Sequence, residues 1–263
     1  MTRLLQIFIL FSGVLVSLIS STTMAEPTKV TLLHKPFLQK TLSQEQIALY
    51  YPQQPVTLSY PQEVRLSQVL TDAYAQLNYQ PYSLGTALID LSKQQQIDEK
   101  KHAILKQLQD INTPASNYIA KKLNSLDFVY RERIETDPSK VRVNPKYDPM
   151  LKGVYQLFLP KRPQHIYLIN ADDHNYLTLK LTANSNLKDY LAEQFEANRY
   201  TYDSAWIIQA NQDVYQATDI QWKGKLYFLS PGAIVFIGLT DLPEKYRDLN
   251  ADIAHLLAFL LEP

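Results

Sequence analysis

The residues of this chain that could do chemistry are few and lie in two short stretches. Asp172, Asp173 and His174 are adjacent and could ligate a metal ion. They follow an apparent strand, however, and Asp is typical of turns at such positions, so the pattern favours a turn. Glu132 and Asp137 could act as the paired carboxylates of a glycoside hydrolase. Arginines flank Glu132, and ion pairing is the simpler interpretation.

The sequence motifs of common enzyme classes are absent. The chain has no GxSxG nucleophile elbow, no HExxH zinc motif and no glycine-rich phosphate loop. It has no cysteine, which excludes a thiol nucleophile, a thiolate metal site and a disulfide. Its 26 basic and 26 acidic residues balance, which gives no electrostatic argument for a nucleic-acid partner. We therefore expect no catalytic residues, no metal and no cofactor.

Tyrosine and arginine side chains offer binding rather than catalysis. The chain has 18 tyrosines, and a tyrosine ring can stack on a sugar face, although it is equally common in strands and cores. Arg131 could grip a carboxylate or phosphate of an anionic polymer. A surface salt bridge is the alternative role for this arginine. Together with its neighbours Tyr130 and Arg133, Arg131 forms the candidate ligand site.

A sequence repeat indicates how the chain is organised. Residues 56–74 read VTLSYPQEVRLSQVLTDAY, and residues 177–195 read LTLKLTANSNLKDYLAEQF. Each copy begins with alternating apolar residues, as on one face of a strand, and continues through a polar turn. A helix with apolar residues three and four positions apart then follows. The repeat predicts an α+β fold that contains two copies of one unit.

The remaining strands suggest that each copy is a β-grasp domain, in which a strand pair, a crossing helix and further strands follow one another. Val154–Leu159 and His165–Asn170 are predicted to form a hairpin that opens the second domain. The first domain is expected over residues 26–145 and the second over residues 146–240. Residues 85–127 predict a helical hairpin inserted in the first domain, with apolar positions that include Leu88 and Leu91. Thr113 is its expected cap and Pro114 the first residue of its second helix.

The last segment, residues 241–263, predicts one amphipathic helix of about 20 residues, capped by Asp241. Its apolar stripe could contact a partner or a membrane, and it consists of Tyr246, Leu249, Ile253, Leu256, Leu257 and Leu260. Three interpretations of this helix remain open. It could pack on its own domain, bind a partner or membrane, or assemble with like helices into a ring.

Residues 1–25 have the layout of a cleavable secretory signal. One early charge, Arg3, precedes the apolar run Leu4–Ile19, and small residues stand before Glu26. An uncleaved membrane anchor is the alternative, because the run approaches the length that spans a bilayer. Export and the missing cysteines together suggest a bacterial periplasm.

Several motifs resemble those of the GfcC-type capsule biosynthesis proteins. The strongest is Leu242–Asn250, which reads LPEKYRDLN, and a second is Asp137-Pro138 followed by Val141–Val143. Pro231-Gly232 fits the family's PPG turn less fully. The resemblance implies two β-grasp units and a terminal amphipathic helix, as in parts of outer-membrane polysaccharide export proteins, where that helix builds a channel wall.

The resemblance also bears on the candidate ligand site. Arg131 occupies the position of an arginine that the family has just before the Asp-Pro pair. Two departures stand out, since residues 35–55 are longer and more polar than the family pattern and Tyr130 replaces a glycine.

Three functions are consistent with the sequence. The first is a non-enzymatic periplasmic factor in capsule or exopolysaccharide biosynthesis and export, which binds polysaccharide or an outer-membrane export protein. The second is a glycan-modifying hydrolase of the periplasm. The third is a structural assembly protein that oligomerises through its C-terminal helix.

Overall fold

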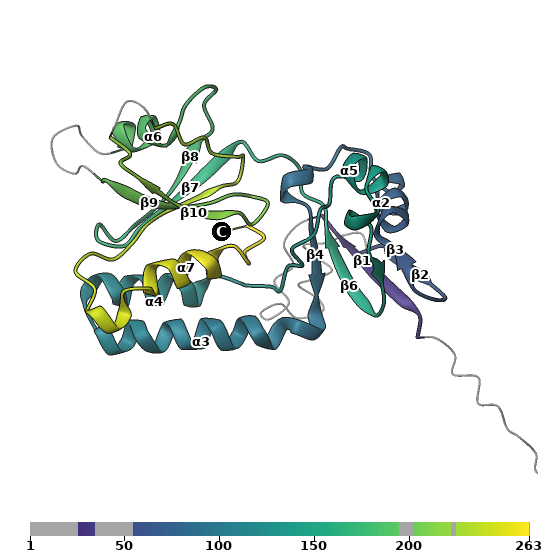
Figure 1. The fold of residues 1–263 in the computed structure, drawn as a ribbon, viewed down its shortest axis with the longest axis horizontal. Helices are drawn as coiled ribbons and strands as arrows, with labels where there is room; N and C mark the ends of the chain where they lie inside the picture. The colour runs from purple at the N-terminus through teal and green to yellow at the C-terminus, as the bar shows by residue number, and fades with distance from the viewer. Residues whose placement is uncertain (1–25, 35–54, 195–201, 222–224, 263) are drawn as a thin grey trace, which may run out of the picture.

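The computed structural model describes residues 26–34, 55–194, 202–221 and 225–262 and shows an α+β fold built around two larger sheets (Figure 1). The expected signal of residues 1–25 lies outside the described residues. Most of the long polar stretch of residues 35–55 lies outside them as well.

The first sheet has four strands in the order β2-β1-β6-β4. Their bounds are Thr57–Tyr60 for β2, Thr28–Leu33 for β1, Val154–Phe158 for β6 and Ala87–Asp90 for β4. One face is covered by α2, Leu66–Ala75, and α5, Pro138–Val143. A two-stranded pair of β3, Val64–Arg65, and β5, Met150–Leu151, lies beside them.

The second sheet has five strands in the order β10-β9-β11-β7-β8. Their bounds are Val214–Thr218, Ser204–Ile208, Ile234–Ile237, His165–Asn170 and Asn175–Lys180, respectively. Helix α6, Leu187–Gln194, packs on one face of this sheet. The opposite face carries α7, Leu249–Leu257. Figure 1 shows the two helices on opposite sides of the sheet.

The two sheets share one strand order. In the first sheet, β1 is antiparallel to the edge strand β2 and parallel to β6, which is the last of its strands along the chain. In the second sheet, β7 is likewise antiparallel to the edge strand β8 and parallel to β11. The two copies of the sequence repeat fall on β2–α2 and on β8–α6, at equivalent places in the two sheets. The repeat is therefore a repeat of structure. The β-grasp name for this common order stays a prediction.

The predicted hairpin between Val154–Leu159 and His165–Asn170 is wrong. Strand β6 lies in the first sheet, between β1 and β4, whereas β7 lies in the second sheet, between β11 and β8. Each of these strands has a parallel partner in its own sheet. The connection between them therefore runs from one unit to the other, and the first unit extends to Phe158 rather than ending at residue 145.

The inserted helical hairpin consists of α3, Gln94–Ile111, and α4, Pro114–Ser125. Thr113 caps α4 as predicted, because its Oγ1 accepts from the backbone N–H of Ser116 and the Ser116 hydroxyl accepts from the N–H of Thr113. The hairpin begins later than predicted. Leu88 lies in β4 and Leu91 in a 3-10 turn, because the fourth strand of the first sheet occupies residues 87–90.

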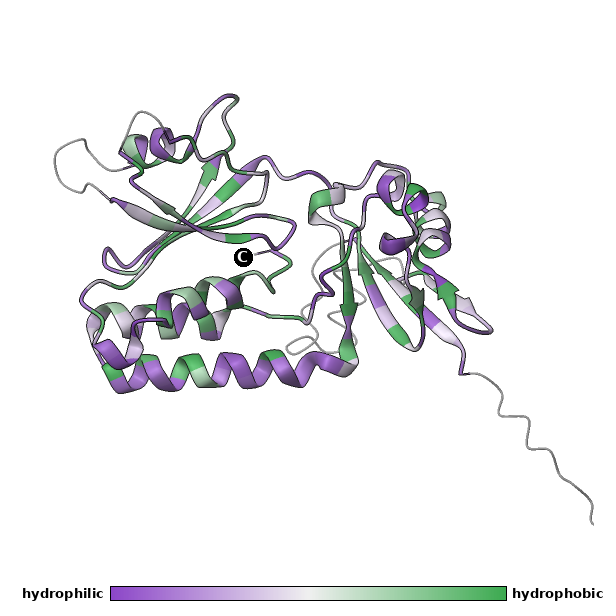
Figure 2. Cartoon of the chain, in the orientation of Figure 1, coloured by the Kyte–Doolittle hydropathy of each residue, from purple (hydrophilic) through white to green (hydrophobic). Residues whose placement is uncertain are grey.

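The hairpin packs against the second unit although it is inserted in the first. Ile104 of α3 and Leu123 of α4 share one apolar core with Phe236 of β11 and Ile253 of α7. Figure 1 shows α3 running from the end of β4 to a position beneath the second sheet. In Figure 2, α7, which lies between the sheet and α3, is mainly apolar, whereas α3 is mainly hydrophilic. The hairpin thus ties the two units together.

The C-terminal segment is not one long helix. It forms a 3-10 turn over Glu244–Tyr246 and then α7. The side chain of Asn250, in the first turn of α7, donates to the carbonyl of Leu239 and accepts from its N–H, both at 2.9 Å. Gly238 permits this approach, since a Cβ at that position would lie 2.5 Å from the Asn250 side chain.

Each residue of the predicted interaction stripe is at most 8% exposed, from Tyr246 through Leu249, Ile253, Leu256 and Leu257 to Leu260. The packed alternative is therefore the one that the structure contains. Contact of these side chains with a partner or membrane would require α7 to leave the core. Within the described ranges, no helix combines the length and the apolar character needed to cross a bilayer.

Candidate functional site

A short segment joins the two units at the centre of the molecule. Arg131 forms an antiparallel bridge with Ile89 of β4, and Phe128 forms another with Leu260 near the C-terminus. Residues 128–132 therefore lie between the first sheet and the C-terminal segment. This position places the Arg131 side chain at the junction of the two units.

Arg131 is buried and bonded to carbonyl oxygens. Its side chain donates from Nη1 to Leu260 at 2.8 Å and to Ala258 at 3.4 Å, and from Nη2 to Ala210 at 2.9 Å. Among the described residues, no carboxylate oxygen lies within 4.0 Å of its guanidinium. Burial lowers the pKa of Arg131 to about 10, so the group stays charged at neutral pH. The junction therefore holds a positive charge without an acidic partner.

A cavity of about 310 Å³ lies beside Arg131. Side chains from both units and from the C-terminal segment line it, including Tyr82, Arg131, Phe158, Lys161, Arg162, His165, Tyr167, Leu257, Leu260 and Glu262. Four buried side-chain polar atoms in the described part of the chain have no hydrogen-bond partner. Two of them, the Tyr82 hydroxyl and Arg131 Nε, belong to residues that line this cavity. Unpaired buried polar atoms are costly, and a ligand that reached either atom would offset that cost.

The lining of this larger cavity is mainly apolar, and its charged side chains are mostly basic. Lys161, Arg162 and Arg131 stand against one acidic residue, Glu262. The Arg162 guanidinium lies 5.9 Å from the centre of the Tyr82 ring, within the range of a cation–π contact. Burial raises the pKa of Tyr82, against smaller lowering effects of the neighbouring Ser230 side chain and of Arg162, so its hydroxyl keeps its proton at neutral pH. The cavity is suited to an anionic ligand.

A histidine–tyrosine pair completes the wall. His165 Nε2 and the Tyr167 hydroxyl are 2.6 Å apart, and their rings meet edge to face with centroids 4.9 Å apart. Burial, followed by the nearby Tyr176 and Glu262, raises the pKa of Tyr167 to about 12. The Tyr167 hydroxyl is therefore uncharged at neutral pH. Together, His165 and Tyr167 place hydrogen-bonding groups within an aromatic part of the cavity wall.

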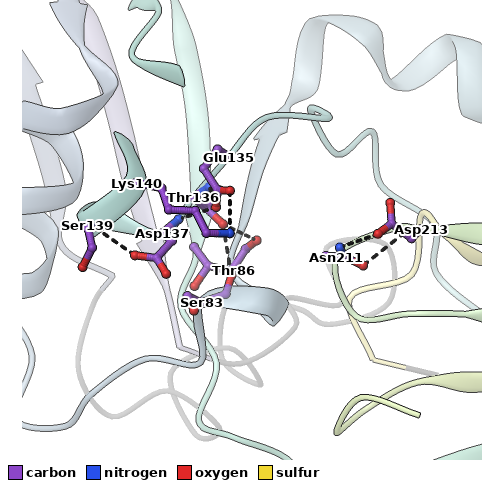
Figure 3. Close-up of polar contacts among 9 residues, drawn as sticks. All are labelled: Ser83, Thr86, Glu135, Thr136, Asp137, Ser139, Lys140, Asn211 and Asp213. Atoms are coloured by element: carbon purple, nitrogen blue, oxygen red, sulfur yellow. Dashed lines mark hydrogen bonds and ion pairs between the residues drawn. The ribbon is translucent and has the colours of Figure 1, made fainter. Parts of the chain in front are cut away.

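A smaller cavity of about 280 Å³ lies on the other side of Arg131 and is mainly polar. Figure 3 shows several of its lining side chains in hydrogen bonds or ion pairs with one another or with neighbouring residues. Thr136 Oγ1 donates to the carbonyl of Ser83 at 3.1 Å, and Lys140 Nζ donates to Glu135 at 3.0 Å. Because these groups already have partners, the larger cavity is the better candidate binding site.

The two halves of the chain match the two halves of one family. Residues 43–162 match the family described as capsule biosynthesis GfcC, N-terminal, and residues 176–260 match capsule biosynthesis GfcC C-terminal. The chain belongs to the GfcC family. This membership indicates a role in capsule biosynthesis. The resemblance inferred from the sequence motifs is thereby confirmed.

A curated relative agrees with the GfcC assignment. The chain is 26% identical over 145 residues to the protein named "Uncharacterized protein YjbG" of Escherichia coli (strain K12). The match covers 54% of this chain and 59% of that protein, so the chain spans little more than half the length of this relative.

The structure brings two of the three residues of the candidate ligand site to one cavity and places the third elsewhere. Arg131 and Arg133 both line the smaller cavity, where Arg133 is exposed and donates to the carbonyl of Gln212 at 3.1 Å. Tyr130 lines neither cavity. Its ring packs against Phe259 with centroids 5.9 Å apart. Arg131, predicted to grip an anionic ligand or to form a surface salt bridge, is buried, and its guanidinium bonds backbone carbonyls.

The other candidate groups have structural partners. Glu132 pairs with Lys93 rather than with the arginines beside it in sequence. Asp137 caps α5, since its carboxylate accepts from the N–H of Ser139 at 2.8 Å. Residues 171–174 form the predicted turn between β7 and β8, with His174 at a left-handed φ of 52°. Across the described ranges, no group of three or more His, Asp or Glu side chains could hold a metal ion.

Several lining residues of the larger cavity were missed by the sequence reasoning. Lys161 and Arg162 were assigned to a hairpin turn, yet they lie on the connection between the two units. Tyr82 and His165 carry no local signal, because residues distant in the sequence meet only once both sheets have formed. The excess of tyrosines was the one compositional hint, and it named no position.

Proposed function

We propose that this chain is a non-enzymatic periplasmic factor in capsule or exopolysaccharide biosynthesis and export, and that it binds an anionic glycan in the larger cavity. The observation that carries the proposal is the pair of buried, unpartnered polar atoms, Tyr82 hydroxyl and Arg131 Nε, on residues lining that cavity. A sugar carboxylate or hydroxyl that reached either atom would offset the desolvation cost of that atom.

Size, charge and chemistry support the same ligand class. A cavity of about 310 Å³ is at the lower end of small-molecule sites and suits one or two sugar residues of a longer chain. Basic side chains favour a carboxylate or phosphate substituent, and tyrosine rings favour a sugar face. Membership of a capsule biosynthesis family supports capsular polysaccharide as the polymer that is bound.

The hydrolase alternative has less support. Glu132 is held by Lys93 and Asp137 caps a helix, so neither carboxylate is poised for proton transfer to a ligand. An assembly function through the C-terminal helix would require breaking the apolar core around Ile253 and Leu256. Such burial contributes roughly 1.5–3 kcal/mol per side chain, which opposes release of the helix.

The binding test compares two tyrosines that differ only in location. Tyr82→Phe removes an unpartnered hydroxyl in the larger cavity, and Tyr74→Phe removes an unpartnered hydroxyl outside both cavities. Each change should raise the free energy of unfolding by about 1 kcal/mol, since a buried polar group without a partner is eliminated. Calorimetric titration with capsular oligosaccharides should show about threefold to tenfold weaker binding for Tyr82→Phe only.

Two results would contradict the proposal. One is the absence of binding by the wild-type protein to purified capsular polysaccharide. The other is an equal affinity of Tyr82→Phe and wild type. A pull-down with the outer-membrane polysaccharide export protein, made with and without added polysaccharide, tests whether the chain recognises the machinery instead of the polymer. Cell fractionation of the producing bacterium tests the periplasmic location.

A further inference from the structure

A second aromatic surface lies next to the larger cavity and is outside it. Tyr215 of β10 is 36% exposed and Phe228 is 58% exposed. The rings of Tyr215 and Tyr227 lie with centroids 6.5 Å apart and planes 29° from parallel. We refer to Tyr215, Tyr227 and Phe228 as the aromatic platform. Exposed large apolar side chains that gather at one place mark interaction sites more often than isolated ones do.

One side chain connects the aromatic platform to the larger cavity. Gln209, which lines the cavity, donates from Nε2 to the Tyr215 hydroxyl at 2.8 Å and to the carbonyl of Phe228 at 2.9 Å. Its Oε1 accepts from the N–H of Ser230 at 2.8 Å. All the polar atoms of this amide are engaged, so Gln209 holds β10 and residues 227–230 at a fixed distance. The platform is therefore continuous with the cavity rim.

The platform offers ring faces with polar edges rather than an aliphatic surface. The Tyr227 hydroxyl donates to the carbonyl of Thr218 at 3.0 Å, which fixes the ring, and the ring stacks on that of Tyr215. Tyrosine rings suit ligands that are apolar on one side and hydroxylated at the rim, as sugar rings are. An exposed edge strand such as β10 can also pair with a strand of another protein, and this is the competing occupant.

We propose that the aromatic platform carries the glycan chain onward from the larger cavity, so that the protein grips several consecutive sugar residues of one polymer. This inference rests on the proposed function. It adds that affinity depends on the length of the chain, because a short fragment fills only the cavity and a long one also reaches Tyr215 and Phe228.

The test measures affinity as a function of ligand length. Oligosaccharides from partial hydrolysis of the producing strain's capsular polysaccharide are titrated into wild type and into Tyr215→Ala and Phe228→Ala. Long fragments should bind wild type more tightly than short ones. Each substitution should weaken the long fragments by about threefold to tenfold and leave the shortest bound fragment unchanged. Tyr215→Phe keeps the ring and should retain most of the long-fragment affinity.

Controls separate this inference from the proposed function and from misfolding. Val143→Ala changes an apolar side chain that is 79% exposed and lines neither cavity, so long-fragment binding should match wild type. Thermal melts establish that each variant folds. Wild type binding no fragment at all overturns the proposed function and this inference together. Two results overturn the inference about the platform alone. One is binding whose affinity does not depend on fragment length, and the other is an equal loss of affinity for short and long fragments in Tyr215→Ala. Capture of an export protein that Tyr215→Ala abolishes, with glycan affinity unchanged, assigns the surface to strand pairing and also overturns it.

Discussion

Replacing Arg131 by methionine should destabilise the whole protein, because this side chain joins three parts of the chain. Its guanidinium bonds the C-terminal segment at Leu260 and the turn after β9 at Ala210, while its backbone pairs with Ile89 of the first sheet. Methionine fills much of the same space and donates no hydrogen bond. The change therefore removes the bonds and the charge and keeps most of the packing.

The size of the effect follows from opposing contributions. Two short bonds, at 2.8 and 2.9 Å, are lost, and each carbonyl left without a partner in the interior costs about 1–3 kcal/mol. The third bond, to Ala258 at 3.4 Å, counts little, since that carbonyl also accepts from Gln212 at 3.3 Å. Removing a buried charge without an acidic partner returns part of this cost. We expect the free energy of unfolding to fall by about 2–4 kcal/mol.

Urea denaturation followed by circular dichroism measures this change, and the melting temperature should fall by about 5–10 °C. Arg133→Met is the matched control, because Arg133 is exposed and makes one bond to a carbonyl. Its effect should stay below about 1 kcal/mol. A stability of Arg131→Met equal to or above that of wild type would refute the reasoning, since the desolvation of the guanidinium would then exceed the value of its bonds.

Three further predictions concern the C-terminal segment and the acid range of stability. Gly238→Ala should lower the melting temperature by several degrees in a thermal melt, because the added Cβ meets the Asn250 side chain at 2.5 Å; an unchanged melt would contradict that close approach. Leu256→Ala should lower the free energy of unfolding by about 2–5 kcal/mol in urea, whereas a free helix would show no change. Burial acts to raise the pKa of Glu135, but hydrogen bonds from the backbone and from Lys140 outweigh it and lower that pKa below its ordinary 4.5. The stability that Glu135 contributes is complete above pH 4.5 and is lost as the pH falls through the lowered pKa. Glu135→Gln should therefore flatten the acid part of the curve of unfolding free energy against pH. An unchanged slope in the acid range would argue against this prediction.

Local patterns in the sequence predicted the elements better than their partners. The apolar spacing of residues 66–74 and 187–195 identified α2 and α6 because each helix buries one stripe on its own sheet. Thr113-Pro114 located the start of α4 because a cap acts over one turn. Strand β6 was given the wrong partner, since alternation or burial of a strand does not say which distant strand lies beside it.

The candidate site was predictable only in part, for a related reason. Arg131 was identified as the important arginine, but its burial depends on residues 258–260 and 210, which the local sequence does not place. The position of α7 is fixed in the same way by Asn250, whose side chain bonds the backbone of Leu239. Contacts between parts of the chain far apart in sequence decided both cases.

The inserted hairpin also has a consequence during synthesis of the chain. Helices α3 and α4 leave the ribosome long before β11 and α7, which cover their apolar faces in the finished molecule. Until those last residues emerge, Ile104 and Leu123 have no native cover. The first half of the polypeptide is therefore partly folded and prone to aggregate until synthesis is complete. A holding chaperone should recognise it, and the two halves should not fold when they are expressed as separate chains.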